Sequence, residues 1–384
     1  MWRKIPLAWL QLTREKPRLI VALAGIAFAD FLMFMQLAFR EALFESNVRL
    51  HTSLEGEVVL INPQSNAVNF LESFSQRRLY QALDFKEVAS VHPIYLGLTS
   101  WKNPQTRRSS EVLVIAANPN ELVFNLPGMQ QNLKPIKMPD VVLFDRGSRP
   151  DFGPIATDFD RGKKIETEVG GRRIKVGGVV ELGASFGSDG NIVTSDLNFF
   201  RLFKNRKAGL IDIGLIKLKP GANPETVVAQ LRQYLPKDIQ VLSKQEFIQK
   251  EKDYWATSTP IGFIFALGTV MGFIVGTVIV YQILYSEVSD HLSEYATLKA
   301  MGYSQTYLLL VVFQEAFILA SLGYIPGFGF AVFLYSIAKN ATLLPIYMTV
   351  SRAILVFLLT MLMCFISGLI SVRKLQAADP ADVF

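Results

Sequence analysis

The sequence predicts an α-helical membrane protein with four transmembrane helices plus an α+β domain carried outside the membrane on helical stalks. Half of its 384 residues are hydrophobic, the mean hydropathy is +0.29, and the apolar residues are bunched along the chain. Four apolar runs reach the roughly 20 helical residues that cross a hydrocarbon core. A long stretch of mixed composition, residues 40–259, separates the first run from the other three.

The predicted spans are residues 19–39, 260–286, 307–335 and 353–372. Basic residues close to span ends mark the cytoplasmic side. They precede the first span and follow the last, at Arg3, Lys4, Arg14, Lys16, Arg18, Arg373 and Lys374. Four spans place both termini on one side of the membrane. The cytoplasmic segments are then residues 1–18, 287–306 and 373–384, and the outer segments are residues 40–259 and 336–352.

The first span has an alternative interpretation as a cleaved signal peptide. Small residues in an A-x-A pattern occur at Ala22–Ala24 and at Ala27–Ala29, after a basic lead. Cleavage there would leave an apolar N-terminus, and the run is long enough to span. The sequence therefore favours a retained helix.

The outer stretch has the pattern of an α+β fold. Strands are predicted at 56–62, 88–96, 111–117, 141–144, 211–218 and 239–242. Residues 164–182 are typical of a hairpin that turns at Gly170–Gly171. Helices are predicted at 75–83 and at 224–235, the second with Asn223 as its N-cap and Pro224 in its first turn. The strands are short and mixed with helices, which indicates one or two compact subdomains and not a Rossmann sheet.

The edges of this outer stretch are predicted to form the stalks. After the first span, Leu43, Phe44 and Val48 recur at helical spacing. Before the second span, Ser243 and Glu246 have the spacing of a capping box, and apolar residues continue from there towards Trp255. We therefore expect both spans to extend outward as amphipathic helices that pack together.

Several kinds of chemistry are not supported by the sequence. No P-loop is present, because RGKK at 161–164 lacks the first glycine and the Ser/Thr. GASFG at 183–187 fits the nucleophile-elbow pattern at Ser185, but no helix is predicted after it, and the downstream His291 falls on the other side of the membrane. Cys364 is the one cysteine, and the three histidines are scattered, so no metal site is predicted.

Charge is the remaining clue to binding. The net charge of +6 suits a chain held at an anionic membrane surface, and nucleic acid need not be invoked. Basic runs occur at 161–164, 172–175 and 204–207. Such runs are usually solvated faces, and the sharper hypothesis is a surface for a partner or a lipid headgroup.

Polar and small residues inside the spans are candidates for function or packing. Asp30 lies midway along the first span, where an acid is costly unless it is paired or hydrated. A hydrogen bond to Gln314 or to nearby backbone is the structural alternative, and Glu315 lies close enough to a span end to reach the interface. Small faces that let helices approach closely are formed by Gly268, Gly272, Gly276, Gly323 and Gly327. Their partner helix, in this chain or in a second copy, is left open.

A short polar helix is predicted between the second and third spans, at residues 289–304. Its broad apolar face contains Leu292, Tyr295, Ala296 and Met301. Gly302 is placed to end the helix and Ser304 to cap the next one. The connection is longer than a hairpin needs, and a helix of this size suits docking into a groove of a soluble partner. Because the chain has no P-loop, we expect that partner to hydrolyse ATP.

These features resemble the MacB/LolC/FtsX superfamily of ABC-transporter membrane subunits (type VII). The resemblance is carried by EYATLKAMGYS at 294–304, FQEAFILASLGYIPG at 313–327 and RKLQAADPADVF at 373–384. The N-terminal part is similar to one branch, the DevC-type permease subunits of cyanobacterial DevBCA exporters. That similarity is carried by residues 5–40, by INPQS, FSQRRLY, FNLPG and VVLFDRGSRP, and by EVGGRRIKVGG at 168–178.

The resemblance implies a multi-pass subunit of the inner membrane with a periplasmic domain, acting as a homodimer. Residues 289–304 would be the coupling helix on a DevA-like ATPase, with contacts among Leu292, Glu294, Tyr295, Leu298, Lys299, Met301 and Gly302. ATP and Mg would be bound by that ATPase and no cofactor by this chain, which would not be an enzyme. Further implied partners are a DevB-like periplasmic adaptor, a TolC-like outer-membrane channel and membrane lipids, with efflux of glycolipid or other lipid-like substrates by mechanotransmission. An FtsX-like transducer that regulates a periplasmic enzyme is the alternative.

Overall fold

The computed structural model describes residues 7–377, and the side chains of residues 8–372. Arg3, Lys4 and residues 378–384 lie outside the described residues. The chain divides into two units. We call residues 1–41, 261–339 and 346–384 the membrane unit, and residues 42–260 and 340–345 the sheet unit.

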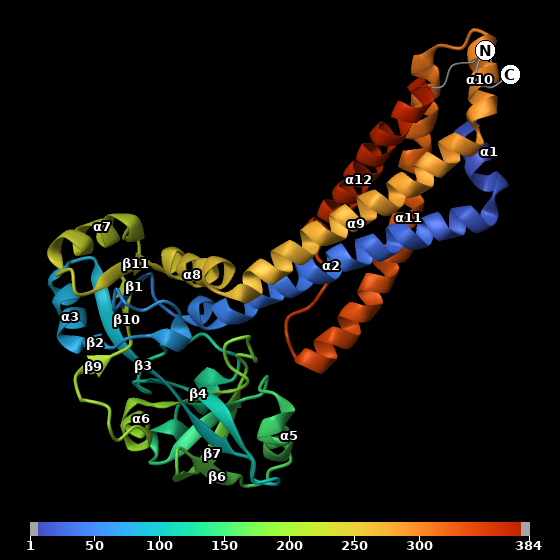
Figure 1. The fold of residues 1–384 in the computed structure, drawn as a ribbon. Coiled ribbons are helices and arrows are strands. Elements are labelled where there is room, and N and C mark those ends of the chain that lie inside the picture. The colour runs from blue at the N-terminus through green and yellow to red at the C-terminus, as the bar shows by residue number, and fades with distance from the viewer. Residues whose placement is uncertain (1–6, 378–384) are drawn as a thin grey trace. The chain divides into compact units, whose positions relative to one another are not determined.

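The membrane unit is built from helices (Figure 1). Their bounds are α1 Leu7–Arg14, α2 Lys16–Ser53, α9 Pro260–Asp290, α10 Leu292–Ala300, α11 Gln305–Thr342 and α12 Val350–Ala377. Four of them, α2, α9, α11 and α12, are long and apolar enough to span a membrane. The four-helix prediction is therefore confirmed.

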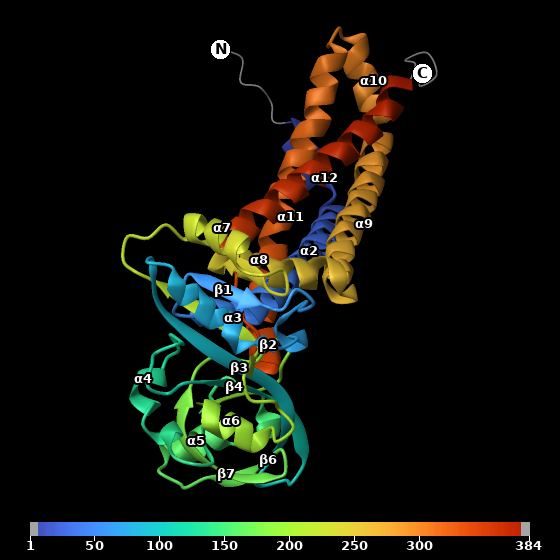
Figure 2. The same cartoon turned by 90° about the vertical axis from the view of Figure 1, so that its left-hand side faces the viewer.

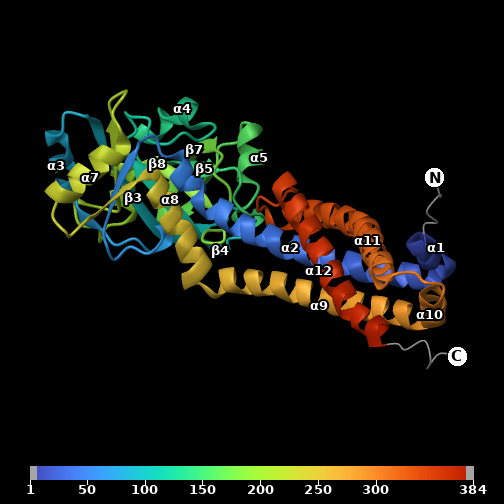
Figure 3. The same ribbon diagram turned by 90° about the horizontal axis from the view of Figure 1, so that it is seen from above.

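Glycines place α2 between two neighbours in its own chain (Figure 3). A methyl group added at Gly276 of α9 would lie 2.7 Å from Ala29 Cβ, and one at Gly323 of α11 would lie 2.6 Å from Ile26 Cγ2. Gly268 faces Gln36 and Gly272 faces Met33 in the same way, and Gly327 faces Ala27 and Asp30. All five predicted glycines thus pack against α2, so α2 of the same chain is a partner helix of these small faces.

Polar contacts also join α2, α11 and α12 near the start of α12. Arg352 in the first turn of α12 pairs with Glu41 of α2 and donates to the carbonyl of Tyr347 at 2.8 Å. Its guanidinium also lies 5.5 Å from the ring centroid of Tyr335 on α11. One buried cation therefore joins three helices where the spans end.

The sheet unit contains a nine-stranded sheet in the order β11-β1-β10-β3-β4-β8-β5-β7-β6. Figure 2 shows part of this sheet, with the long β3 passing beside β1 and β4. The strands are β1 Val58–Ile61, β3 Val88–Lys102, β4 Ser109–Ala117, β5 Val141–Asp145, β6 Glu166–Val169, β7 Arg172–Val180, β8 Asn191–Ser195, β10 Ile213–Leu218 and β11 Gln240–Ser243. A small second sheet pairs β2 Phe74–Ser75 with β9 Leu210–Ile211. Long β3 pairs with both β4 and β6, so the strands from β3 to β6 close into a ring.

Most strand pairs are antiparallel, and β4–β8 and β5–β7 are parallel. The prediction of an α+β fold without a Rossmann sheet is confirmed. Buried apolar side chains cover both faces of the sheet, around Trp101 on one face and Phe124 on the other. The helices here are α3 Gln76–Gln81, α4 Met129–Asn132, α5 Ile155–Asp160, α6 Asp196–Leu202, α7 Pro224–Tyr234 and α8 Lys244–Asp253, with short 3-10 turns at 68–70, 82–84, 135–137 and 150–152.

The helix caps and the turn predicted for the sheet unit are present in the structure. The Asn223 side chain accepts from the amides of Glu225 and Thr226, and Ser243 with Glu246 forms a full capping box. Gly170 and Gly171 both have positive φ, 55° and 74°, in the β6–β7 turn. Ser185 lies in a loop, where its hydroxyl accepts from the backbone of Gly187 and Ser188. The loop interpretation of GASFG therefore holds.

The stalk prediction is right for α2, and for its partner α8 it is right about the capped helix and wrong about the continuity with the second span. α2 is one unbroken helix whose residues belong to both units, and in the sheet unit its His51 ring lies 4.2 Å from that of Phe247 on α8. The extension of the second span is interrupted, because a π-helix at Tyr254–Ser258 and an extended Thr259 separate α8 from α9. Pro260 explains the break, since a residue before proline is driven out of helical geometry.

A pair of glycines two residues apart on α11 tests the packing against α2. A Cβ at Gly327 would lie 3.0 Å from the Ala27 carbonyl oxygen, whereas nothing lies within 4 Å of one at Gly329. Gly327→Ala should unfold more easily than Gly329→Ala by about 1–3 kcal/mol, the usual cost of overpacking. Helix propensity changes equally in both, so the difference isolates the contact. Thermal unfolding in detergent measures it, and equal melting temperatures would contradict the close packing.

Candidate docking site at the turn between α9 and α11

The turn between α9 and α11 is built from two sharp junctions around α10. His291 separates α9 from α10 with φ −96° and ψ 12°, outside helical geometry. After Ala300 the chain leaves the helix through Gly302, whose φ of 92° suits glycine. The amide of Tyr303 then donates to the Leu298 carbonyl at 3.1 Å, and Ser304 Oγ accepts from the Tyr307 amide at 3.3 Å. The predicted roles of Gly302 and Ser304 are thus confirmed, in a helix shorter than residues 289–304.

The buried face of α10 holds it on the bundle. Tyr295 and Ala296 are buried, and Leu292 and Leu298 are half-buried. Tyr295, Leu292 and Leu298 pack in a cluster with apolar side chains of the other helices in the membrane unit, which are Ala8, Val288, Leu308, Val311, Val312 and Val372. Of the residues predicted to contact a partner, Leu292, Tyr295 and Leu298 therefore serve mainly to attach α10 to its own chain.

The opposite side of the turn is open. Every residue from Lys299 to Thr306 is exposed, and we call this segment the exposed turn. Thr297, just before it, is exposed as well. Two large side chains stand out in it, Met301 with 63% and Tyr303 with 47% of its surface exposed. Met301 was predicted on the same apolar face as Tyr295 and is instead on the free side. The prediction was wrong because Met301 follows the last residue of α10, so helical periodicity does not determine the direction of its side chain.

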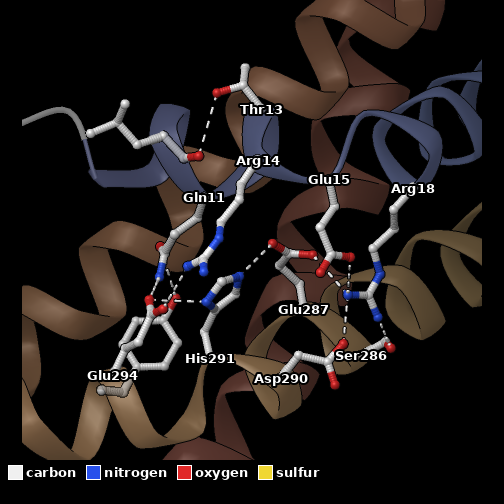
Figure 4. Close-up of polar contacts among 12 residues, drawn as sticks. Gln11, Thr13, Arg14, Glu15, Arg18, Ser286, Glu287, Asp290, His291 and Glu294 are labelled. Atoms are coloured by element: carbon white, nitrogen blue, oxygen red, sulfur yellow. Dashed lines mark hydrogen bonds and ion pairs between the residues drawn. The ribbon is translucent and has the colours of Figure 1, made fainter.

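Glu294 is the centre of a polar network that joins α10 to α1 (Figure 4). Its Oε1 lies 3.2 Å from Arg14 Nη1, and its Oε2 lies 3.0 Å from His291 Nδ1. Gln11 Nε2 donates to the same carboxylate at 3.4 Å. Gln11 also accepts from the Tyr295 hydroxyl at 3.3 Å, and burial raises the pKa of Tyr295, which keeps the hydroxyl a donor.

Arg18 extends the network to the end of α9 (Figure 4). The guanidinium lies 2.6 Å from Asp290 Oδ2 and 3.6 Å from Glu287 Oε2, and it also contacts Ser286 and Glu15. Glu287 in turn lies 3.3 Å from His291 Nε2. Exposed pairs contribute little singly. Together these contacts attach α1, the start of α2, the end of α9 and α10 to one another at the base of the exposed turn.

The polar residues inside the spans are placed differently from the prediction. Asp30 is fully buried, and its carboxylate accepts from Thr360 Oγ1 of α12 at 2.5 Å. Gln314 is exposed and does not bond to Asp30. Glu315 is fully buried, and neither of its carboxylate oxygens has a hydrogen-bond partner among the described residues. No cluster of three metal-binding side chains occurs within that part of the chain either.

Sequence reasoning missed the network partners of Glu294. Gln11 and Arg14 lie 283 and 280 residues away along the chain, and local patterns do not reveal such pairs. His291 was noted as scattered, yet it lies between two carboxylates. Lys299 and Gly302 belong to the exposed turn, and their contact with a partner stays a prediction.

Glu294→Gln tests whether the network holds α10 in place. We expect amide hydrogen exchange in residues 291–296 to rise by up to about fivefold, because exposed ion pairs contribute about 0.2–1 kcal/mol each. Exchange in the rest of α11 should be unchanged. Thr297→Ala is the matched control, since that exposed side chain bonds only within α10, to the Ser293 carbonyl. Unchanged protection in the Glu294 variant would show that the network does not hold α10 in place.

Comparison with known proteins identifies the class. Residues 19–234 match the MacB-like periplasmic core domain, and residues 260–380 match the FtsX-like permease C-terminal domain. Together with four apolar helices, these domains define a multi-pass permease component of an ABC transporter, a class that is generally non-catalytic. The chain belongs to the MacB/FtsX superfamily of ABC-transporter permeases, which confirms the resemblance at that level. The DevC subtype stays a prediction.

Solved structures show more distant likenesses. The periplasmic region of MacB from Actinobacillus actinomycetemcomitans is 12% identical, with 53% of this chain and 94% of that one covered and a TM-score of 0.35. The extracellular domain of the transporter YknZ from Gram-positive bacteria is 10% identical over 48% and 98%, with a TM-score of 0.34. A permease domain from Porphyromonas gingivalis is 13% identical over 49% and 89%, with a TM-score of 0.31. A comparison with curated proteins gave no match.

Proposed function

We propose that this chain is the membrane subunit of an ABC exporter that works by mechanotransmission. A separate ATPase subunit binds ATP and Mg, and the exposed turn receives its movement. The observation that carries the proposal is the division of labour in α10. One side is fixed to the bundle by Tyr295 and the Glu294 network, and the other presents Met301 and Tyr303 to a partner.

The movement passes outward along α2 in this proposal. At its inner end α2 is attached to the end of α9 through Arg18 and Asp290, and the neighbouring α1 is attached to α10 through Arg14 and Glu294. α2 then continues without a break from Lys16 to Ser53. At 1.5 Å per residue, 38 helical residues span about 57 Å. A helix of that length can transmit a displacement from the inner end of the membrane unit to the α2 residues that belong to the sheet unit.

The remaining partners follow from the resemblance to DevC-type subunits. We propose a DevA-like ATPase, a DevB-like periplasmic adaptor, a TolC-like outer-membrane channel and a second copy of this chain. Membership of the superfamily supports an ABC ATPase partner in general. Glycolipid or other lipid-like molecules are the proposed substrates, and this chain itself holds no cofactor.

An FtsX-like transducer is the second candidate. The match of residues 260–380 to the FtsX-like permease domain favours it, since that match does not depend on export. Co-purification separates the two. An adaptor and an outer-membrane channel bound to the chain support export, and a cell-wall hydrolase bound to it supports transduction.

Truncation of the exposed turn tests the docking role. Met301→Ala with Tyr303→Ala should weaken co-purification with the ATPase and lower the stimulation of its ATP hydrolysis by about tenfold or more, because well-packed interface anchors contribute about 2 kcal/mol. Met138→Ala is the control, since Met138 is 55% exposed in the sheet unit. Both proteins should elute from gel filtration as the wild type does. Full ATPase stimulation by the double variant would exclude this turn as the docking site.

Orientation is tested with single introduced cysteines. Cys364 is buried, so the natural thiol should give little background. Cysteine at Thr106 should react with a membrane-impermeant maleimide in intact spheroplasts, and cysteine at Thr297 should react only after lysis, because basic residues near the spans place the termini and the exposed turn in the cytoplasm. Labelling of the Thr297 position in intact cells would reverse the proposed topology.

A further inference from the structure

The sheet unit contains a basic hollow that the coupling role does not use. It has a volume of about 530 Å³ and is lined by the β6–β7 turn and by the end of α6 with the segment after it. Four of its lining residues are cations: Arg172, Arg201, Lys204 and Arg206. They come from two of the three basic runs and from α6, and the third run at 161–164 takes no part. Basic residues that are separated along the sequence therefore lie together in the fold.

Two of the cations are held by one carboxylate. Arg172 donates to Asp140 through Nε at 2.5 Å and Nη2 at 3.0 Å, and Arg201 does so through the same atoms at 2.9 and 2.8 Å. These hydrogen bonds lower the pKa of Asp140 well below its usual range, so it stays ionised. The Nη1 groups of both arginines make no hydrogen bond to the described residues. Asp140 therefore positions two guanidinium groups and neutralises one of their two charges.

The other two cations are less compensated. Arg206 contacts Asp212, whose side chain is buried, and its own buried Nε has no partner among the described residues. Lys204 is exposed and forms no ion pair with that part of the chain. Two carboxylates thus face four cations. Like charges brought together repel one another, and a bound anion would relieve that repulsion.

We propose that this hollow binds a small oxyanion, a phosphate group either free or carried on a lipid headgroup. Arginine presents paired N–H donors that match phosphate oxygens, and lysine adds a point charge. The turn leaves room for a ligand, because nothing lies within 4 Å of a Cβ built on Gly171. The proposal does not depend on the docking role of the exposed turn.

The test uses the full chain in a non-ionic detergent, with inorganic phosphate as the probe and ³¹P NMR line broadening as the measurement. Ionic strength is kept constant with sodium chloride. Lys204→Glu removes a cation that holds nothing in the fold, and should weaken phosphate binding about tenfold through the reversal of one charge near the anion. Lys164→Glu is the matched control, since Lys164 is exposed on the same unit, forms no ion pair with the described residues and does not line the hollow.

A second arm replaces phosphate with a short-chain phosphatidic acid, and a short-chain phosphatidylcholine as the zwitterionic comparison. Tighter binding of the phosphatidic acid, lost in Lys204→Glu, identifies a lipid headgroup as the ligand. Equal or weaker binding identifies free phosphate. Absence of saturable phosphate binding, or equal losses in both lysine variants, would overturn the proposal. Binding of a polyglutamate peptide without competition from phosphate would do the same, because it would indicate a protein-docking surface.

Discussion

The close packing of α2 against α9 and α11 is the constraint on which the rest of the membrane unit depends. Lipid tails are as apolar as leucine, so helices associate in a bilayer through van der Waals fit rather than through exclusion from water. Glycines on both neighbours supply that fit, because the α2 side chains at Ile26, Ala29 and Met33 fill the space that a Cβ would occupy. The polar contacts at the two ends, around Arg18 and around Arg352, attach to an α2 that is already fixed along its length.

The sequence predicted these small faces but not what they meet. A glycine every fourth residue looks the same whether the opposing helix is in the same chain or in another copy, since the motif describes one surface only. The same limit applies to the Glu294 network. Glu294 and Tyr295 stand in a recognisable stretch, yet their partners on α1 are 280 to 284 residues away along the chain. In contrast, caps and turns were predicted well, because Asn223, Ser243 and Gly302 act on their immediate neighbours.

The errors also have physical causes. Helical periodicity placed Met301 beside Tyr295, but the helix ends at Ala300 and the left-handed Gly302 redirects the chain. The predicted strand at 88–96 is part of a longer β3 that continues to Lys102, and that extra length is what pairs with β6 and closes the ring. β8 gave no clear signal, because Asn191–Ser195 is short and polar at both ends. Strand pairing is a non-local property, so the ring could not be read from the individual strands.

The two ends of residues 42–260 are connected to the membrane unit in unequal ways, and this bears on the proposed mechanism. α2 continues from the residues of the membrane unit to those of the sheet unit as a single helix, with an unbroken series of backbone hydrogen bonds. On the other connection, the π-helix at Tyr254–Ser258 and the extended Thr259 interrupt the series before Pro260. A π-helical segment often marks a functional position in a helix. In a mechanotransmission device, the unbroken helix would carry displacement and the interrupted one would accommodate it, because only the interrupted connection can change its backbone angles without breaking helical hydrogen bonds.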